Sequence, residues 1–218
     1  MKKPIRSYVL RQGRTTPAQK RALEELLPKY GLPFTAKELV PEELFLRKAP
    51  LVLEIGSGMG ETTVAIARAH PEADFIAIEV HGPGVGSLLN RIASEKLANV
   101  RVIRHDAVEV LEHMIPDAAL AAIHLFFPDP WPKKRHHKRR LVQPSFVSLM
   151  KKKLSVGGIV HLATDWTEYA DQIDVLFSQN PFFEKAEAGF VSRPGTKFEA
   201  RGRRLGHLVR DLLFRRRV

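Results

Sequence analysis

The feature that most constrains the fold is a regular alternation, after Pro50, of short apolar runs with stretches of helical spacing. The apolar runs cover residues 51–55, 75–80, 100–105, 120–127 and 159–164. The helical stretches cover residues 61–70, 84–97, 107–114, 141–154 and 166–179. Strands that alternate with helices in this way favour a parallel sheet with helices on both faces. We therefore predict an α/β fold with a doubly wound, mostly parallel sheet, which further strands within 182–190 and 205–214 complete to seven.

Residues 1–50, which precede this pattern, differ from it in composition and are interrupted by several prolines. We predict a basic, irregular N-terminal extension over residues 1–50, with one helix over 17–27, and a single domain over residues 51–218. A chain of 218 residues that is 44% hydrophobic can bury one such core. No apolar stretch reaches the about 18 residues of a membrane helix, and the basic start leads into no signal-like apolar region. We expect a cytoplasmic monomer.

Positive charge is concentrated in three segments, residues 1–21, 133–140 and 197–218. The net charge of the chain is +11, and these segments carry more than that, so the remainder is net negative. Clusters of this kind, with a pI near 10.1, are typical of proteins that bind a polyanion such as nucleic acid. The alternative is that the segments are solvated loops and tails.

The first predicted strand leads into a glycine-rich turn, GSGMG at residues 56–60, and then into a helix. In a doubly wound sheet this turn borders the ligand, because glycines let the backbone approach it closely. The spacing G-x-G-x-G differs from the G-x-G-x-x-G that seats a pyrophosphate. Glu54, just before the turn, would repel a phosphate but would hold a cationic amino group.

Two further carboxylates follow the next two strands. Glu79 ends the second, where it can accept hydrogen bonds from both hydroxyls of a ribose, and Asp106 follows the third, near the place of an adenine amino group. A ligand with these parts and no phosphate is S-adenosylmethionine. We expect it to contact Glu54, Gly56, Gly58, Glu79 and Asp106. Singly, each acid is also explained as an exposed strand-end carboxylate or a helix N-cap; the cofactor interpretation depends on their occurrence together.

The fourth predicted strand runs into the sequence FFPDPW at residues 126–131. Prolines on both sides of Asp129 restrict the backbone and give its carboxylate a defined direction. The neighbouring aromatic rings offer planar surface on which a base could stack. Asp129 could accept hydrogen bonds from N1–H and the amino group of a guanine, orient N7 toward the methyl donor and offset the charge that forms on the base. The alternative is a rigid surface turn with a core tryptophan.

Two later segments carry polar groups that could complete an acceptor site, one after the fifth strand and one over residues 193–202. The groups available for the guanine edge and the nearby phosphates are Asp165, Thr196, Glu199, Lys133 and Lys197. Both segments are otherwise explained as loops. The chain has no cysteine, and its nine histidines lack the spacing of metal ligands, so we predict no metal site.

Several motifs together resemble one protein family over nearly the whole chain. They are RTTPAQKRAL at 14–23, LEIGSGMG at 53–60, IEVHGPGVGSLL at 78–89, FPDPWPKKRHHKRR at 127–140, TDWTEYA at 164–170 and RPGTKFEARGRRLGH at 193–207. The chain is similar in these motifs to the bacterial tRNA (guanine-N7)-methyltransferases. The resemblance implies a Rossmann-like class I methyltransferase domain over residues 51–218, S-adenosylmethionine as methyl donor, and the variable-loop guanine at position 46 of tRNA as acceptor.

The resemblance also implies roles for individual residues. Asp129 would be the active-site residue and would contact the cofactor as well, together with Glu54, Glu79 and Asp106. The substrate-binding residues would be Lys133, Asp165, Thr196, Lys197, Phe198 and Glu199. The RNA-binding residues would be Arg135, His136, His137, Lys138, Arg139 and Arg140. Two other functions remain open: a non-catalytic RNA-binding or chaperone protein with this fold, and methylation of another nucleic acid, such as a ribosomal RNA guanine.

Overall fold

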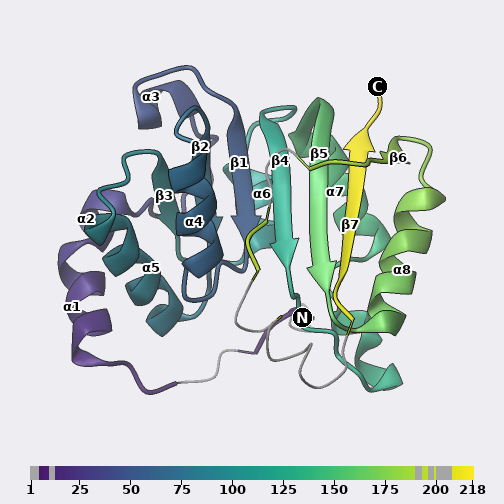
Figure 1. Ribbon diagram of the computed structural model, residues 1–218, viewed down its shortest axis with the longest axis horizontal. Coiled ribbons are helices and arrows are strands. Elements are labelled where there is room, and N and C mark those ends of the chain that lie inside the picture. Colours follow the sequence, from purple (N-terminus) through teal and green to yellow (C-terminus); the bar gives the residue numbers. More distant parts are fainter. Residues whose placement is uncertain (1–4, 10–12, 190–192, 196–198, 200–207) are drawn as a thin grey trace.

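The computed structural model describes residues 5–9, 13–189, 193–195, 199 and 208–218. Its centre is a seven-stranded sheet in the order β3-β2-β1-β4-β5-β7-β6 (Figure 1). The strands are β1 (Leu51–Ile55), β2 (Asp74–Ile78), β3 (Val100–Ile103), β4 (Leu120–Phe126), β5 (Leu154–Thr164), β6 (Phe183–Lys185) and β7 (Arg210–Arg216). The first five strands are mutually parallel, and β7 runs antiparallel to both β5 and β6. The predicted fold class is therefore confirmed.

Helices cover both faces of the sheet. They are α4 (Glu61–Ala69), α5 (Gly82–Ser94), α6 (Ala107–His113), α7 (Pro144–Lys153) and α8 (Thr167–Ser178). Figure 1 shows α4 and α5 in front of the sheet and α6 and α7 behind it. Successive residues of β1 enter different apolar clusters: Val52 packs with the residues of α4 and α5, whereas Leu53 packs with those of α6, α7 and α8. This period of two is the reason for two separate cores.

The region before β1 is more regular than the predicted extension. Helix α1 (Pro17–Glu25) begins at a capping box in which Thr16 and Gln19 exchange hydrogen bonds between side chain and backbone. The Gln19 amide donates to Ser87 Oγ at 2.9 Å, which fastens α1 to α5. Gly86 permits this close approach, because a Cβ there would lie 2.6 Å from the Gln19 carbonyl oxygen.

The rest of this region follows the sheet edge. Short helices α2 (Leu27–Tyr30) and α3 (Pro41–Phe45) follow α1, and the Leu32 N–H donates to the Val102 carbonyl of β3 at 2.8 Å. Residues 13–50 thus form a layer on the domain, because their apolar side chains cover its core. The domain boundary at residue 50 stays a prediction.

Element ends differ from the predicted ones in physically explicable ways. Helix α7 starts at Pro144 rather than residue 141, since proline is suited to the first helical turn. Strand β5 starts at Leu154, earlier than predicted, because two glycines within it hid its first half. The basic segment forms a 3-10 helix, η1 (Lys134–Arg139), which was not predicted. In the part of the chain that the structure describes, no helix is long and apolar enough to cross a membrane.

Candidate active site

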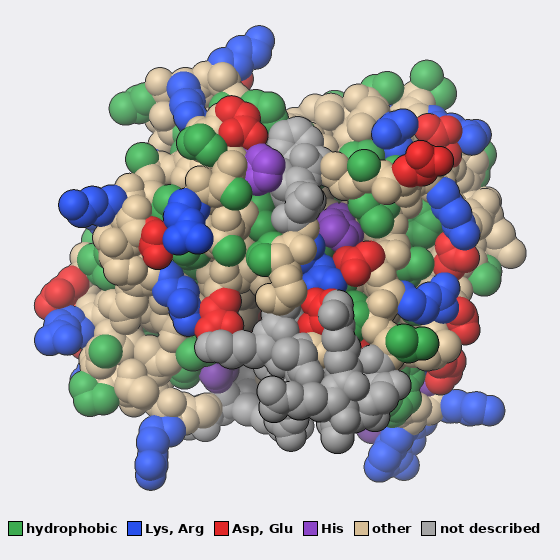
Figure 2. Space-filling model, in the orientation of Figure 1, with side chains coloured by type: hydrophobic (Ala, Val, Ile, Leu, Met, Phe, Trp, Pro, Cys, Tyr) green, Lys and Arg blue, Asp and Glu red, His purple; other side chains and the backbone are tan. Residues whose placement is uncertain are grey.

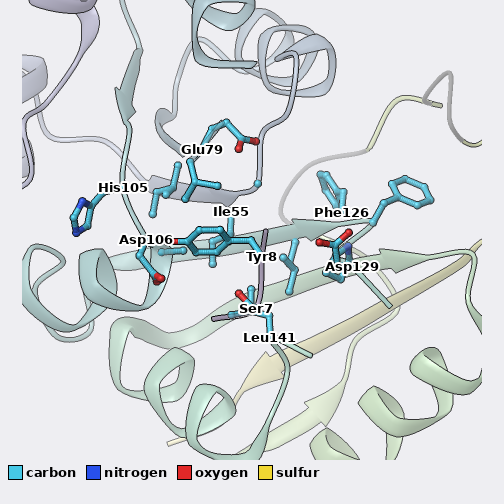
Figure 3. A pocket seen from close by; sticks show the side chains of 16 residues that line it. Ser7, Tyr8, Ile55, Glu79, His105, Asp106, Phe126, Asp129 and Leu141 are labelled. Carbon is cyan, nitrogen blue, oxygen red and sulfur yellow. The ribbon is translucent and has the colours of Figure 1, made fainter. Parts of the chain in front are cut away.

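The carboxyl ends of the parallel strands border a cavity of about 250 Å³ (Figure 3). It lies where the chain order reverses between β1 and β4, which is the usual ligand position in an open α/β sheet. The lining includes Ser7, Tyr8, Ile55, Gly56, Glu79, His105, Asp106, Phe126, Phe127, Asp129 and Leu141. Four predicted site residues therefore meet in one cavity: Gly56, Glu79, Asp106 and Asp129.

The glycine turn has room on its ligand side and is tightly packed at its end. Gly56 and Gly58 have φ values of 74° and 56°, and a Cβ at either position would meet nothing within 4 Å. A Cβ at Gly60 would lie 2.5 Å from Leu88 Cδ1 of α5. The first two glycines therefore provide the left-handed backbone and open space, whereas the third allows α4 and α5 to pack closely.

The Glu79 carboxylate is oriented by the backbone on both sides. Its Oε2 accepts a hydrogen bond from the Gly58 N–H, and its Oε1 accepts one from the His81 N–H, each at 2.8 Å. Gly84 supports this arrangement, because a Cβ there would lie 2.6 Å from the Gly58 carbonyl oxygen. Main-chain donors therefore fix the carboxylate at the end of β2.

Glu54 precedes the cavity-lining residue Ile55, does not itself line the cavity and is only 4% exposed. Burial is the main cause that raises its pKa to about 7; the nearby Thr63 hydroxyl opposes the rise, and the charge of Glu79 adds to it. A cation placed beside Glu54 would favour its ionised form. A ligand with an ammonium group therefore fits this position.

Asp106 and the N-terminal segment meet at the other end of the cavity. Asp106 is the N-cap of α6, and its Oδ1 accepts from the Val108 N–H at 2.9 Å. Tyr8 crosses the cavity with its hydroxyl toward Asp106 (Figure 3). Burial, the Asp106 charge and a hydrogen bond to Asp106 raise the pKa of Tyr8. Ser7 and Tyr8 were missed by the sequence reasoning, since nothing in the local sequence links them to β3.

The loop after β4 carries Asp129, which is exposed at the rim of the cavity. The backbone is left-handed at Phe127, with φ 52°, and at Trp131, with φ 45°. Trp131 is partly buried rather than open for stacking: its Nε1–H donates to the Ser7 carbonyl at 2.9 Å, and the Arg139 guanidinium lies 4.1 Å from its ring centre. This loop therefore touches the N-terminal segment.

The predicted RNA-binding residues fall into different environments. Arg135 and Lys138 are exposed, as is Lys133, which was predicted to bind substrate. His136 and His137 are partly buried, His136 against the edge of Trp131 and His137 at 3.6 Å from Glu168. The basic segment contains no acidic residue, whereas basic and acidic side chains are interspersed on the face of the molecule shown in Figure 2.

Arg140 lies in a different environment from the exposed members of this set. Its side chain is 1% exposed and bonds to protein groups, which removes it from the surface that a phosphate could reach. In the sequence, Arg140 cannot be distinguished from the other basic residues of this segment. The structure shows that Arg140, the C-cap of η1, points inward.

The C-terminal part of the site is organised by Arg193. Its Nη1–H donates to Glu199 Oε2 at 2.7 Å, and its Nε–H and Nη2–H donate to the two Asp211 oxygens at 2.9 Å. Asp211 also bonds to His161 Nε2 at 2.8 Å. Burial raises the pKa of Asp211, but hydrogen bonds from His161 and Arg193 outweigh this effect and lower it well below its usual range. Asp165 is partly exposed at the end of β5, and Thr196, Lys197 and Phe198 lie outside the described residues.

The sheet order, the open glycine turn and the acids at successive strand ends define a class I methyltransferase fold. Solved structures agree: the 16S rRNA methyltransferase KamB matches with a TM-score of 0.59 at 16% identity, over 81% of this chain and 92% of that one. An O-methyltransferase from Thermotoga maritima matches with a TM-score of 0.54 at 14% identity, over 84% and 68%. Residues 48–212 match the family described as "Putative methyltransferase".

Sequence relatives narrow the class to one family. The tRNA (guanine-N(7)-)-methyltransferase of Nitrosomonas europaea is 57% identical, over 98% of this chain and 97% of its own length. That of Nitrosospira multiformis is 54% identical, over 99% and 96%. The chain belongs to the tRNA (guanine-N(7)-)-methyltransferase family.

Proposed function

We propose that this chain transfers a methyl group from S-adenosylmethionine to N7 of a guanine in tRNA, the guanine at position 46 of the variable loop. The observation that carries the proposal is the joint presence of two features. The chain is 57% identical to a relative with that activity in its name, and its cavity has acids at the ends of β2 and β3 and on the loop after β4. We further propose that the protein acts in the cytoplasm as a monomer.

The acids of the site and the open glycine turn suit the cofactor. Glu54 would hold the amino group, and the open space at Gly56 and Gly58 would accept the ligand against the backbone. Glu79 uses one lone pair of each oxygen for the backbone and has others for the ribose hydroxyls. Asp106 would face the adenine amino group. When bound, S-adenosylmethionine supplies an electrophilic methyl group on a positively charged sulfur.

Asp129 would act on the acceptor base. It is exposed at the rim and lines the cavity, so one carboxylate can face both cofactor and incoming guanine. It would accept from the N1–H and amino group of guanine and turn N7 inward. N7 carries no proton, so no general base is needed. The negative charge of Asp129 would offset the positive charge that develops on the base.

Other groups would position the RNA. Asp165 follows the end of β5, and Glu199 lies in the segment before β7. Both would contact the substrate, together with Thr196, Lys197 and Phe198, which precede Glu199 in the sequence. The groups that would face the RNA backbone are Lys133, Arg135, His136, His137, Lys138 and Arg139. Cations at these positions would steer the RNA to the cavity and make its binding dependent on salt.

The test is methylation of unmodified tRNA transcripts with cofactor that carries a labelled methyl group. Nuclease mapping should place the label on N7 of the guanine at position 46, and a transcript with adenine at that position should stay unlabelled. Label on an exocyclic amine or at another guanine would contradict the proposal. Label in ribosomal RNA but not in tRNA would assign the chain to a different acceptor.

A further inference from the structure

Arg140 is a buried cation at the end of the basic segment, residues 133–140. Its side chain is 1% exposed, whereas Arg135 and Lys138 of the same segment are exposed. A buried guanidinium is unfavourable unless its donors are satisfied. The partners of Arg140 therefore indicate what it does.

One partner belongs to the loop that carries Asp129. The Arg140 Nε–H donates to the Pro130 carbonyl oxygen at 2.8 Å. Pro130 directly follows Asp129, so this bond fixes the loop backbone one residue after the proposed active-site carboxylate.

The opposite side of the guanidinium is held by α8 and η1. Its Nη1–H donates to Gln172 Oε1 at 2.6 Å, and its Nη2 lies 3.1 Å from His137 Nε2 and 3.6 Å from Glu168 Oε1. The guanidinium carbon also lies 4.9 Å from the centre of the Tyr169 ring. Since α8 packs on the sheet, it gives Arg140 a rigid base.

The loop that carries Asp129 depends on side-chain contacts such as this one, because its backbone forms few hydrogen bonds of its own. Its described backbone hydrogen bonds lie at its two ends, from Phe127 N–H to the Ala163 carbonyl and from His136 N–H to the Lys133 carbonyl. The three prolines between these ends have no N–H to donate. Left-handed φ values at Phe127 and Trp131 add strain that the surroundings must offset.

We propose that Arg140 is a positioning residue, which holds the Asp129 loop against α8 through Pro130 and makes no contact with RNA phosphates. The proposal rests on the proposed function for the role of Asp129. Arginine suits the task because its planar fork reaches the loop carbonyl, Gln172 and His137 at once, which the single ammonium group of lysine cannot do.

Arg140→Lys separates positioning from phosphate binding, since lysine keeps the charge but loses the fork. We expect kcat to fall by up to about 10²-fold, while KM for tRNA and the salt dependence of tRNA binding stay as in the wild type. Arg140→Gln should also leave the salt slope unchanged. The matched control is Lys138→Gln in the exposed part of the segment, which should lower the log–log salt slope by about 0.7–0.9 and raise KM.

A second measurement needs no RNA. Hydrogen exchange of the peptide over residues 127–135 should become faster in Arg140→Lys and remain unchanged in Lys138→Gln, with the exchange of β1 unchanged in both. Gln172→Leu, which removes one partner of Arg140, should increase loop exchange in the same direction. Wild-type kcat in Arg140→Lys, a reduced salt slope in Arg140→Gln, or unchanged loop exchange would overturn the proposal. Failure of the proposed function would be separate, because the wild-type protein would then not methylate tRNA.

Discussion

The two halves of the cavity hold their carboxylates by different means. At the ends of β2 and β3, backbone N–H groups orient the acids: Glu79 accepts from Gly58 and His81, and Asp106 accepts from Val108 as the N-cap of α6. In the other half, arginine side chains take this part: Arg140 bonds to the Pro130 carbonyl in the loop that carries Asp129, and Arg193 bonds to the Glu199 carboxylate.

The half that is held by backbone groups is expected to be rigid, and the half that is held by arginine side chains is expected to be more adaptable. We call the half with Glu79 and Asp106 the cofactor half, and the half with Asp129 and Glu199 the acceptor half. Backbone donors are fixed by the strand and turn that carry them, so the cofactor half is preorganised. Arginine contacts join segments that are distant in sequence, so the acceptor half depends on side chains that single substitutions can release. A half that receives a small, constant ligand can be rigid, whereas one that receives a large RNA gains from adjustable segments.

The largest effect is expected at Asp129, where the halves meet. Asp129→Ala should lower kcat by about 10²–10³-fold, since it removes a preorganised charge that acts mainly in the transition state. Single-turnover methylation at saturating tRNA measures this, and the tRNA Kd should change far less. Asp129→Asn should fail too, because its amide donors would face the donors of guanine. A near wild-type rate in Asp129→Ala would remove this residue from the site.

The cofactor half should respond to Glu79→Ala in cofactor binding alone. Loss of a charged acceptor costs about 1.5–3 kcal/mol per hydrogen bond, so the cofactor Kd should rise by at least about tenfold. Calorimetry measures it, with Glu95→Ala as a control in an exposed acid that pairs with Arg68. The tRNA affinity should stay constant. Unaltered cofactor affinity would disprove the assigned role of Glu79.

The acceptor half should respond to Arg193→Lys in the opposite way. Lysine can keep one of the three contacts with Glu199 and Asp211, so kcat/KM for tRNA should fall about tenfold, while cofactor affinity is retained. The control is Arg210→Lys on β7, next to Asp211, where the arginine pairs with Asp171 at the surface. If cofactor affinity also falls, the two halves are not independent.

The same division explains what the sequence could predict. The glycine turn and the acids at residues 54, 79 and 106 follow strands that are recognisable by their apolar runs, so their common edge could be inferred. The inward direction of Arg140 and the contact of Tyr8 with Asp106 could not, because they arise from chain segments that meet only after folding. The sequence also suggested Trp131 as a surface on which a base could stack. In the folded chain Arg139 lies over its ring, and this contact too forms only after folding.

The smallest expected effect is a pH dependence of cofactor binding that originates at Glu54. The pKa of Glu54 is about 7 in the free protein, because the group is buried and Glu79 lies nearby. A bound ammonium group favours the ionised form, so binding releases a proton, and affinity must fall as the pH falls through 7. For a pKa of about 7, the cofactor Kd should rise about fourfold between pH 8 and pH 6.5. Calorimetry at pH 7 in two buffers of different ionisation enthalpy should detect release of about half a proton. Glu54→Gln should weaken binding at pH 8 and abolish both the pH dependence and the proton release. Proton release that persists in Glu54→Gln would assign the titration to another group of the cofactor half.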